Sequence, residues 1–285
     1  METKANCIWQ EIAEQEHILY IRQDKFHFFQ AMGLISVEKI LSFSNETTKQ
    51  NRRKDRDMTI VVSFGINFYI KRCQYLRGWN YVKARLFPKS FQSPAALEVK
   101  NYKILEKLNI PTAITVAWGE KRCHGRVLAC FIITEELQGT PLQDYLQKCS
   151  DQEKQKIGQS IAQVMHQIHS ANLYYADLKA KHLYCQTNGT LALLDVARVL
   201  PIPFWRSQLD VYAEELANLH QSLSLALIAF PERFQFLMLF REKQDCQNVP
   251  SERKLLSKII AKLRWKAFSK KWRKRLRKLL RMDDL

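Results

Sequence analysis

The sequence predicts an α+β protein in which a small β-rich lobe comes before a larger helical lobe. Residues 57–88 and 110–138 are rich in Val, Ile, Phe, Tyr and Thr, the residue types that strands favour. From about residue 141, apolar residues recur at spacings of three and four, which is the period of an amphipathic helix. No repeat of solenoid length interrupts this change from strand to helix composition.

We expect residues 1–250 to form a single domain, with the amino-terminal lobe at about 20–138 and the carboxy-terminal lobe at about 139–250. Of the 285 residues, 46% are hydrophobic and 11% aromatic, so the chain has ample material for a core. Residues 251–285 differ in composition, and we expect them to form a basic amphipathic helix.

The helical lobe is predicted to contain a long helix that begins at residue 151. Asp151 can cap this helix, and the acids that follow suit the positive end of the helix dipole. Residues 211–217 and 223–229 are predicted to be further helices, and Pro231 suits the first turn of another. The apolar stripe of the long helix should face the core, and it consists of Ile157, Ile161, Val164, Met165 and Ile168.

Residues 173–198 carry the most informative pattern, because two isolated aspartates follow apolar runs there with a histidine between them. Asp177 follows the run LYY, which is predicted to be a strand, and Asp195 ends the run LALL. The dipeptide NG at residues 188–189 predicts a hairpin turn before the second run. We expect the two carboxylates to lie at the ends of adjacent strands and to share one pocket.

This layout is typical of a phosphotransfer site. Phosphoryl transfer needs one carboxylate to orient the attacking hydroxyl and another to hold the metal ion that bridges the nucleotide phosphates. Asp177 suits the first role and Asp195 the second. His182 stands five positions after Asp177, where protein kinases have the metal-binding asparagine of H-R-D-x-x-x-x-N. The residues directly before Asp177 are Tyr175 and Ala176 instead of His and Arg.

With aspartate followed by histidine in the asparagine position, the loop resembles that of the lipopolysaccharide kinase family, the Kdo and core-heptose kinases of Gram-negative bacteria. The likeness covers roughly residues 50–245. Five other segments resemble the same family in the same order: residues 67–71 (NFYIK), 93–98 (SPAALE), 108–112 (LNIPT), 117–119 (AWG) and 131–137 (FIITEEL). The resemblance implies a protein-kinase-like two-lobed fold with ATP as the phosphoryl donor.

The resemblance also implies how the nucleotide is bound. Lys71 would contact the phosphates and pair with Glu98, while Glu135 through Leu137 would present backbone groups to adenine. His169 would brace the catalytic loop.

Arg206 and Glu215 resemble family positions in the large lobe, and neither is assigned to catalysis.

One element of protein kinases is missing, because no G-x-G-x-x-G motif precedes Lys71. The segment has only Gly65, at a predicted hairpin turn. The basic run around Arg52 and Arg53 could bind phosphate in its place, since guanidinium groups bind phosphate in a forked geometry. The alternative is that this run is a solvated loop.

The expected metal is Mg²⁺, held by Asp195 with help from His182. Because magnesium prefers oxygen ligands and an imidazole nitrogen suits manganese better, Mn²⁺ is the alternative ion. The alternative for His182 is a hydrogen-bonded core histidine without a metal.

The carboxy-terminal tail is strongly basic and accounts for most of the formal net charge of +17. Apolar residues, several of them aromatic, alternate with its cations at near-helical spacing, which favours an anionic membrane surface. Nucleic acid is a weaker candidate for the partner of the tail, because no recognisable nucleic-acid module accompanies it. The remaining alternative is that the tail is a solvated helix. Residues 262–281 contain no acid and include Lys262, Arg264, Lys266, Lys270, Lys271, Arg273, Lys274, Arg275, Arg277, Lys278 and Arg281.

The expected location is the cytoplasm, with peripheral attachment to the inner membrane. No signal-like segment begins the sequence, and no apolar run approaches the ~20 residues of a membrane-spanning helix. The seven cysteines include no C-x-x-C pair, which indicates reduced thiols instead of disulfides or a zinc site.

We therefore predict an enzyme that moves the terminal phosphoryl group of ATP to a sugar hydroxyl of the lipopolysaccharide core, a glycolipid. A kinase acting on Ser, Thr or Tyr of proteins could use the same active centre. A membrane-docked pseudokinase scaffold would explain the missing Gly-rich loop and the missing His-Arg. The joint presence of Lys71, Glu98, Asp177 and Asp195 favours the enzyme.

Overall fold

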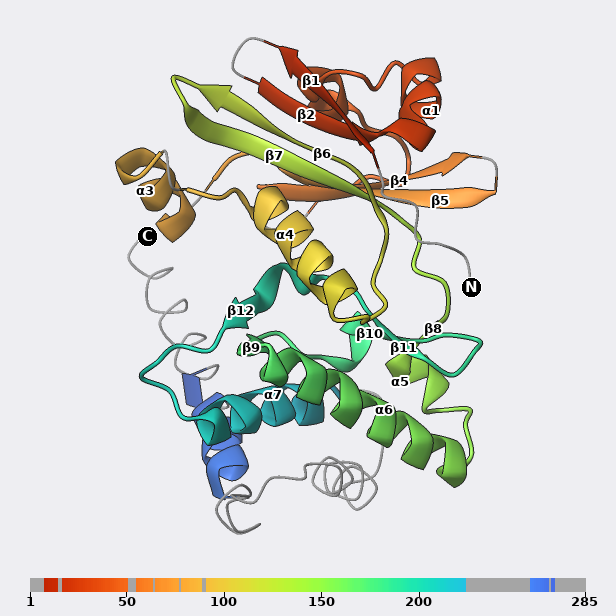
Figure 1. Cartoon of the computed structure of the whole chain (residues 1–285), viewed down its shortest axis with the longest axis vertical. Coiled ribbons are helices and arrows are strands. Elements are labelled where there is room, and N and C mark those ends of the chain that lie inside the picture. The colour runs from red at the N-terminus through yellow and green to blue at the C-terminus, as the bar shows by residue number, and fades with distance from the viewer. Residues whose placement is uncertain are drawn as a thin grey trace, which may run out of the picture. The chain divides into compact units, whose positions relative to one another are not determined.

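The computed structural model describes residues 8–14, 17–50, 55–63, 65–76, 78–88, 91–223, 257–266 and 268–269 (Figure 1). Contacts between residues divide the chain into two compact units. The amino-terminal unit comprises Met1–Gln138 and Asp195–Ala197, and the carboxy-terminal unit comprises Gly139–Leu194 and Arg198–Leu285. The described part of the chain contains no helix that is both long and apolar enough to cross a bilayer.

The amino-terminal unit is built on a seven-stranded antiparallel sheet in the order β1-β2-β6-β7-β5-β4-β3 (Figure 1). The sheet starts before residue 20, the expected beginning of the lobe. Its strands are β1 (Trp9–Glu14), β2 (His17–Arg22), β3 (Lys49–Gln50), β4 (Arg56–Ser63), β5 (Ile66–Cys73), β6 (Thr115–Cys123) and β7 (Arg126–Glu135).

The strand prediction for residues 57–88 is wrong in its last part, because Gly78–Leu86 forms helix α3. That segment includes Ala, Leu, Arg and Lys, which have high helix propensity, and its cations lie in the last turn, where the helix dipole favours them. The other helices of this unit are η1 (Gln23–Lys25), α1 (Phe26–Ala31), α2 (Val37–Ser42) and α4 (Pro94–Lys107).

Helix α4 packs against β6 and β7 (Figure 1). It begins sharply because the Ser93 hydroxyl accepts a hydrogen bond from the Ala96 N–H at 3.1 Å and Pro94 occupies the first turn. After the helix ends, Asn109 adopts a left-handed conformation with φ of 56°, which asparagine tolerates better than most residues. The chain then turns toward β6.

Strand β5 alternates between two faces of the sheet. Phe68 and Ile70 are buried in the core on one face, and Lys71 lies on the other face. Arg72 shares the core face but is charged, and it is neutralised there by Asp57 of β4. Arg72 also donates to the carbonyl oxygen of Ile40 at 3.1 Å, so the cation ties the sheet to α2.

The carboxy-terminal unit is mainly helical, as predicted. Its elements are β8 (Thr140–Pro141), α5 (Leu142–Tyr145), α6 (Asp151–Ser170), β9 (Leu173–Tyr175), η2 (Ala180–His182), β10 (Leu183–Cys185), β11 (Leu191–Leu193), β12 (Val199–Pro201) and α7 (Gln208–Leu223), with η3 (Val196–Arg198) at the junction of the two units. The predicted helices at residues 223–229 and after Pro231 lie outside the described residues, apart from Leu223, which ends α7.

Helix α6 confirms the predicted helix and its apolar stripe, all five members of which are buried. Its cap differs from the prediction, because Ser150 is the N-cap residue and Asp151 is already helical. The Ser150 hydroxyl accepts from the Glu153 N–H at 3.4 Å, and the Glu153 carboxylate accepts from the Ser150 N–H at 2.7 Å. This reciprocal pair is a capping box.

The short strands form two separate sheets, which corrects the expectation that Asp177 and Asp195 follow adjacent strands. Strand β11 pairs with β10 across the predicted turn, where Gly189 has a φ of 76°. Strand β9, which leads to Asp177, pairs with β12 instead. The prediction treated the two apolar runs before the aspartates as neighbours, but each run has a different partner.

Candidate functional site

In the amino-terminal unit, the structure brings the predicted pair Lys71 and Glu98 together. The Lys71 Nζ lies 3.0 Å from the Glu98 Oε1, which also accepts from the Tyr102 hydroxyl at 3.1 Å. Glu98 is only 6% exposed, so its carboxylate needs these two partners to offset the loss of water. The alternation of β5 and the position of Glu98 in the second turn of α4 place the two side chains on the same side of the sheet.

The segment predicted to receive adenine has part of its backbone already in use. The Glu135 N–H donates to the Ile114 carbonyl at 2.9 Å, and the Glu136 N–H donates to the Asn67 carbonyl at 2.8 Å. These two N–H groups are therefore not available to a ligand, whereas the prediction had them facing adenine. The backbone N–H of Leu137 and the carbonyl groups of the segment are the remaining candidates.

The acidic side chains of the same segment are held by neighbours. The Lys25 Nζ lies 2.8 Å from the Glu135 Oε1, and Asn67 and Tyr69 donate to the Glu136 carboxylate at 2.8 and 3.0 Å. Such contacts hold the side chains in place, so their role is to rigidify this end of β7.

The segment before Lys71 was predicted to contain a hairpin turn at Gly65 and phosphate contacts from Arg52 and Arg53. Gly65 has a φ of 74° between the paired strands β4 and β5, as the predicted hairpin turn requires. Arg52 and Arg53 lie outside the described residues.

In the carboxy-terminal unit, Asp177 lies in the loop between β9 and η2. The Lys179 Nζ is 2.5 Å from the Asp177 Oδ1. The carbonyl oxygen of Asp177 lies 3.0 Å from the Nδ1 of His182, and a carbonyl can only accept, so Nδ1 carries the proton of this bond. His182 is only 4% exposed, which gives its ring a fixed orientation.

Asp195 follows strand β11 in the chain. The N–H of Leu194 donates to the His182 carbonyl at 2.9 Å, and one peptide bond joins Leu194 to Asp195. One possible ligand atom from each of Asp177, His182 and Asp195 lies within 4.8 Å of the other two. Asp195 has a φ of 58°, a left-handed conformation that is uncommon outside glycine and often found at functional positions.

This donor set fits a divalent cation. Two carboxylates supply the oxygen atoms that Mg²⁺ prefers, and the imidazole nitrogen is acceptable to Mn²⁺. A histidine that donates its Nδ1–H to a backbone carbonyl is oriented in the way that metal-binding histidines usually are. The residues present are therefore compatible with either ion.

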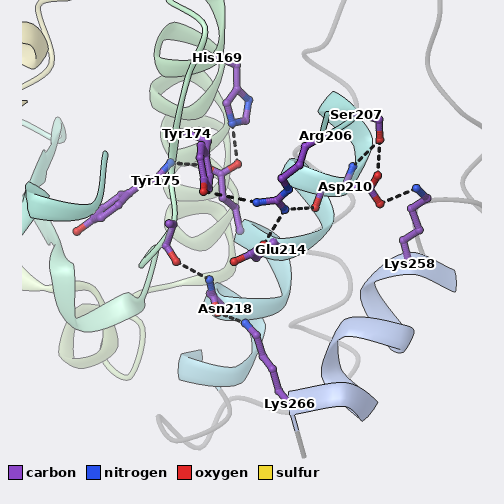
Figure 2. Close-up of polar contacts among 12 residues, drawn as sticks. His169, Tyr174, Tyr175, Arg206, Ser207, Asp210, Glu214, Asn218, Lys258 and Lys266 are labelled. Carbon is purple, nitrogen blue, oxygen red and sulfur yellow. Dashed lines mark hydrogen bonds and ion pairs between the residues drawn. The ribbon is translucent and has the colours of Figure 1, made fainter. Parts of the chain in front are cut away.

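Helix α7 holds the catalytic loop by three residues on one face. The Glu215 Oε1 accepts from the Tyr175 N–H at 2.6 Å, and the Asn218 Nδ2 donates to the Ala176 carbonyl at 3.0 Å (Figure 2). The Ser222 hydroxyl accepts from the Ala180 N–H at 2.9 Å. Because residues three, four and seven apart share a face, a single helix contacts the loop on both sides of Asp177.

His169 was predicted to support the catalytic loop, and its contact with the loop runs through Glu215. The His169 Nε2 lies 2.7 Å from the Glu215 Oε2, and the carboxylate is fully buried (Figure 2). Burial raises the pKa of Glu215, and its hydrogen bond with His169 opposes that shift. The pair connects α6 to the loop through α7, and neither residue belongs to the grouping of Asp177, His182 and Asp195.

Arg206 likewise has a structural role. Its guanidinium lies 2.7 Å from the Glu214 carboxylate and over the ring of Tyr174, with 5.4 Å to the ring centroid. These contacts fix the connection between β12 and α7.

Three residues with clear positions in the site were missed from the sequence. Lys179 could have been noticed as a cation two positions after Asp177. Asn218 and Ser222 could have been noticed as polar residues at helical spacing from Glu215.

Comparisons with known proteins give a family match and a fold match. The model of the lipopolysaccharide kinase (Kdo/WaaP) family matches residues 49–236, whereas no curated protein matches the chain by sequence. The solved structure of WaaP in complex with acyl carrier protein is similar with a TM-score of 0.62 and 16% identity, over 86% of this chain and 98% of that chain. At that identity the similarity concerns the fold, and it confirms the predicted kinase-like fold.

A weaker similarity involves WbdD, a bifunctional kinase-methyltransferase, with a TM-score of 0.43 and 13% identity. It covers 73% of this chain and 48% of that chain.

Proposed function

The chain belongs to the lipopolysaccharide kinase (Kdo/WaaP) family, and from that premise we propose that it transfers the terminal phosphoryl group of ATP to a sugar hydroxyl of the lipopolysaccharide core. Membership makes the chain a kinase. The observation that carries the proposal is the grouping of Asp177, His182 and Asp195 in a loop of the family's catalytic type.

Asp177 is the proposed catalytic residue. Its carboxylate would accept a hydrogen bond from the acceptor hydroxyl and orient or deprotonate it for attack on the phosphorus atom. Lys179, at 2.5 Å from Asp177 Oδ1, would offset the negative charge that the transferred group brings close to this carboxylate.

Asp195 and His182 would hold the metal ion. Such an ion neutralises charge on the nucleotide phosphates. The protein's contribution is to orient these two residues. The hydrogen bond from His182 Nδ1 to the Asp177 carbonyl fixes the orientation of the imidazole ring. The hydrogen bond from the Leu194 N–H to the His182 carbonyl fixes the backbone that leads into Asp195.

Lys71 would contact the nucleotide phosphates while Glu98 keeps its ammonium in place. The segment from Glu135 to Leu137 would meet adenine through those backbone groups that the sheet does not use. Arg52 and Arg53 are proposed as additional phosphate contacts.

The acceptor would be reached at the cytoplasmic face of the inner membrane, with residues 262–281 bound to anionic lipid. In support of this, Ile260, Trp265 and Phe268 have exposed side chains in the described part of the tail. Tryptophan suits the interfacial region of a bilayer, and basic residues are attracted to its negative surface.

The first test is ATP binding by calorimetry in Mg²⁺ and then in Mn²⁺, with Asp195→Ala and the exposed-carboxylate control Asp144→Ala. We expect metal-dependent binding in the wild type and the control, and its loss in Asp195→Ala. Absence of binding in a folded wild type would refute the proposal and favour a pseudokinase scaffold.

The acceptor is tested separately with radiolabelled ATP, lipopolysaccharide and a mixture of proteins. Label in the glycolipid that disappears in Asp177→Asn supports the proposal. Label in protein alone would identify a protein kinase instead.

A further inference from the structure

The described part of the tail is a helix that runs along α7 (Figure 2). We call residues 257–266 and 268–269 the tail helix. The Lys258 Nζ lies 2.6 Å from the Asp210 Oδ1, and the Lys266 Nζ donates to the Asn218 Oδ1. Both pairs are separated by 48 residues, so the two helices run parallel in a constant register.

The register places two complementary stripes against each other. On the tail helix, Lys258, Lys262 and Lys266 follow one another at intervals of four and share a face. On α7, Asp210, Glu214 and Asn218 have the same spacing. Hydrogen bonds from Lys258 and Ser207 lower the pKa of Asp210, and the charge of Lys262 contributes in the same direction.

Asn218 belongs to two networks at once. Its Nδ2 donates to the Ala176 carbonyl, directly before Asp177, while its Oδ1 accepts from Lys266 (Figure 2). The amide oxygen can only accept and the amide nitrogen can only donate. A cation on the oxygen therefore determines which end of the amide faces the catalytic loop.

The charges that act on Lys266 are those expected for a lysine beside Asn218 and the catalytic loop. Burial lowers its pKa, and the negative charges of Glu214 and Asp177 oppose that shift. The charge of Lys179 acts on it as well. Lys266 is thus within electrostatic range of the loop that carries Asp177.

We propose that Lys266 is a positioning residue for phosphoryl transfer, which acts by holding the Asn218 amide in the orientation that supports the Ala176 carbonyl and so the backbone at Asp177. The proposal rests on the proposed function for its catalytic consequence. It gives the tail helix a second task besides membrane contact, since the lysine stripe faces α7 while Ile260, Trp265 and Phe268 are exposed.

The test compares Lys266→Met with Lys156→Met, which removes an equal charge from an exposed position on α6. For Lys266→Met we expect kcat to fall on the order of tenfold with KM for ATP unchanged, as the loss of one charge-assisted hydrogen bond predicts. Lys156→Met should match the wild type. Lys266→Arg keeps a cation and should retain more activity than Lys266→Met.

A double-variant cycle tests the route of the effect. If Lys266 acts through Asn218, adding Lys266→Met to Asn218→Ala causes no further loss of kcat. Losses that multiply would overturn the proposal, and so would a Lys266→Met enzyme that behaves like Lys156→Met.

Amide exchange separates this proposal from the proposed function, because it needs no turnover. The peptide covering residues 174–182 should exchange faster in Lys266→Met than in Lys156→Met. Equal exchange refutes the positioning role. If the wild type transfers no phosphate while the exchange difference is present, the proposed function fails and the positioning of the loop stands.

Discussion

Replacing Glu215 by alanine should destabilise the carboxy-terminal unit and displace the catalytic loop. Glu215 is fully buried, and its two carboxylate oxygens accept from the Tyr175 N–H at 2.6 Å and the His169 Nε2 at 2.7 Å. Alanine removes the acceptor of both donors in a place that water does not reach. The backbone directly before Asp177 then loses one of its anchors.

The size of the effect follows from these two contacts. An unsatisfied buried donor costs about 1–3 kcal/mol, so two of them give a loss of about 2–6 kcal/mol in the free energy of unfolding. Glutamine is the matched control, because its oxygen can accept from Tyr175 and its amide nitrogen can donate to the ring of His169. We expect a loss below about 1.5 kcal/mol for Glu215→Gln.

The glutamine variant also isolates the ionisation of Glu215. Burial raises the pKa of Glu215 above its usual 4.5, which means that the folded state holds the proton more tightly than the unfolded state. The stability from this group is complete below pH 4.5 and is lost as the pH rises through the folded pKa. The wild type should therefore lose stability relative to Glu215→Gln over that pH interval.

Urea unfolding followed by circular dichroism at several pH values measures both effects. The reasoning is refuted if Glu215→Ala and Glu215→Gln are equally stable, because the two hydrogen bonds would then contribute nothing. An opposite pH trend would show that the partners of the carboxylate outweigh its burial.

Two further predictions concern the nucleotide and the membrane. Lys71→Met removes the cation that contacts Glu98 and should weaken ATP binding on the order of tenfold or more by calorimetry. The exposed control Lys100→Met on α4 should bind ATP as the wild type does. Equal affinities in Lys71→Met and the wild type would remove Lys71 from the nucleotide site. Deleting residues 262–285 should abolish sedimentation with anionic liposomes, since each well-placed basic residue contributes about 1 kcal/mol. Retained binding, or equal binding to zwitterionic vesicles, would contradict the membrane role.

The deletion removes Lys266 as well as the exposed aromatic residues, so its effect on catalysis needs a separate variant. Trp265→Ala with Phe268→Ala changes only exposed side chains of the tail helix. That variant should lose liposome binding in part while keeping kcat toward a delipidated acceptor.

Patterns within short segments predicted much of the fold. The alternation around Lys71, the apolar stripe of α6 and the Asn-Gly turn before Asp195 each gave the correct element, because side-chain direction repeats every two or 3.6 residues. The errors arose where local composition was ambiguous. Helix α3 lies in residues 57–88, whose overall composition favours strands, and it was therefore predicted to be strand. Asp151 was predicted to be the cap of α6 in place of Ser150, because both residue types cap helices.

By itself, the sequence determined the strand of Lys71 from its alternating apolar residues and the strands before Asp177 and Asp195 from their short apolar runs. The helix of Glu98 was predicted from the family resemblance. Only the tertiary structure decided that β9 pairs with β12, that α7 holds the catalytic loop through Asn218, and that Lys266 contacts the same asparagine. These contacts join residues more than twenty positions apart. A hydrogen bond at that separation depends on how helices and strands pack, which no local periodicity specifies.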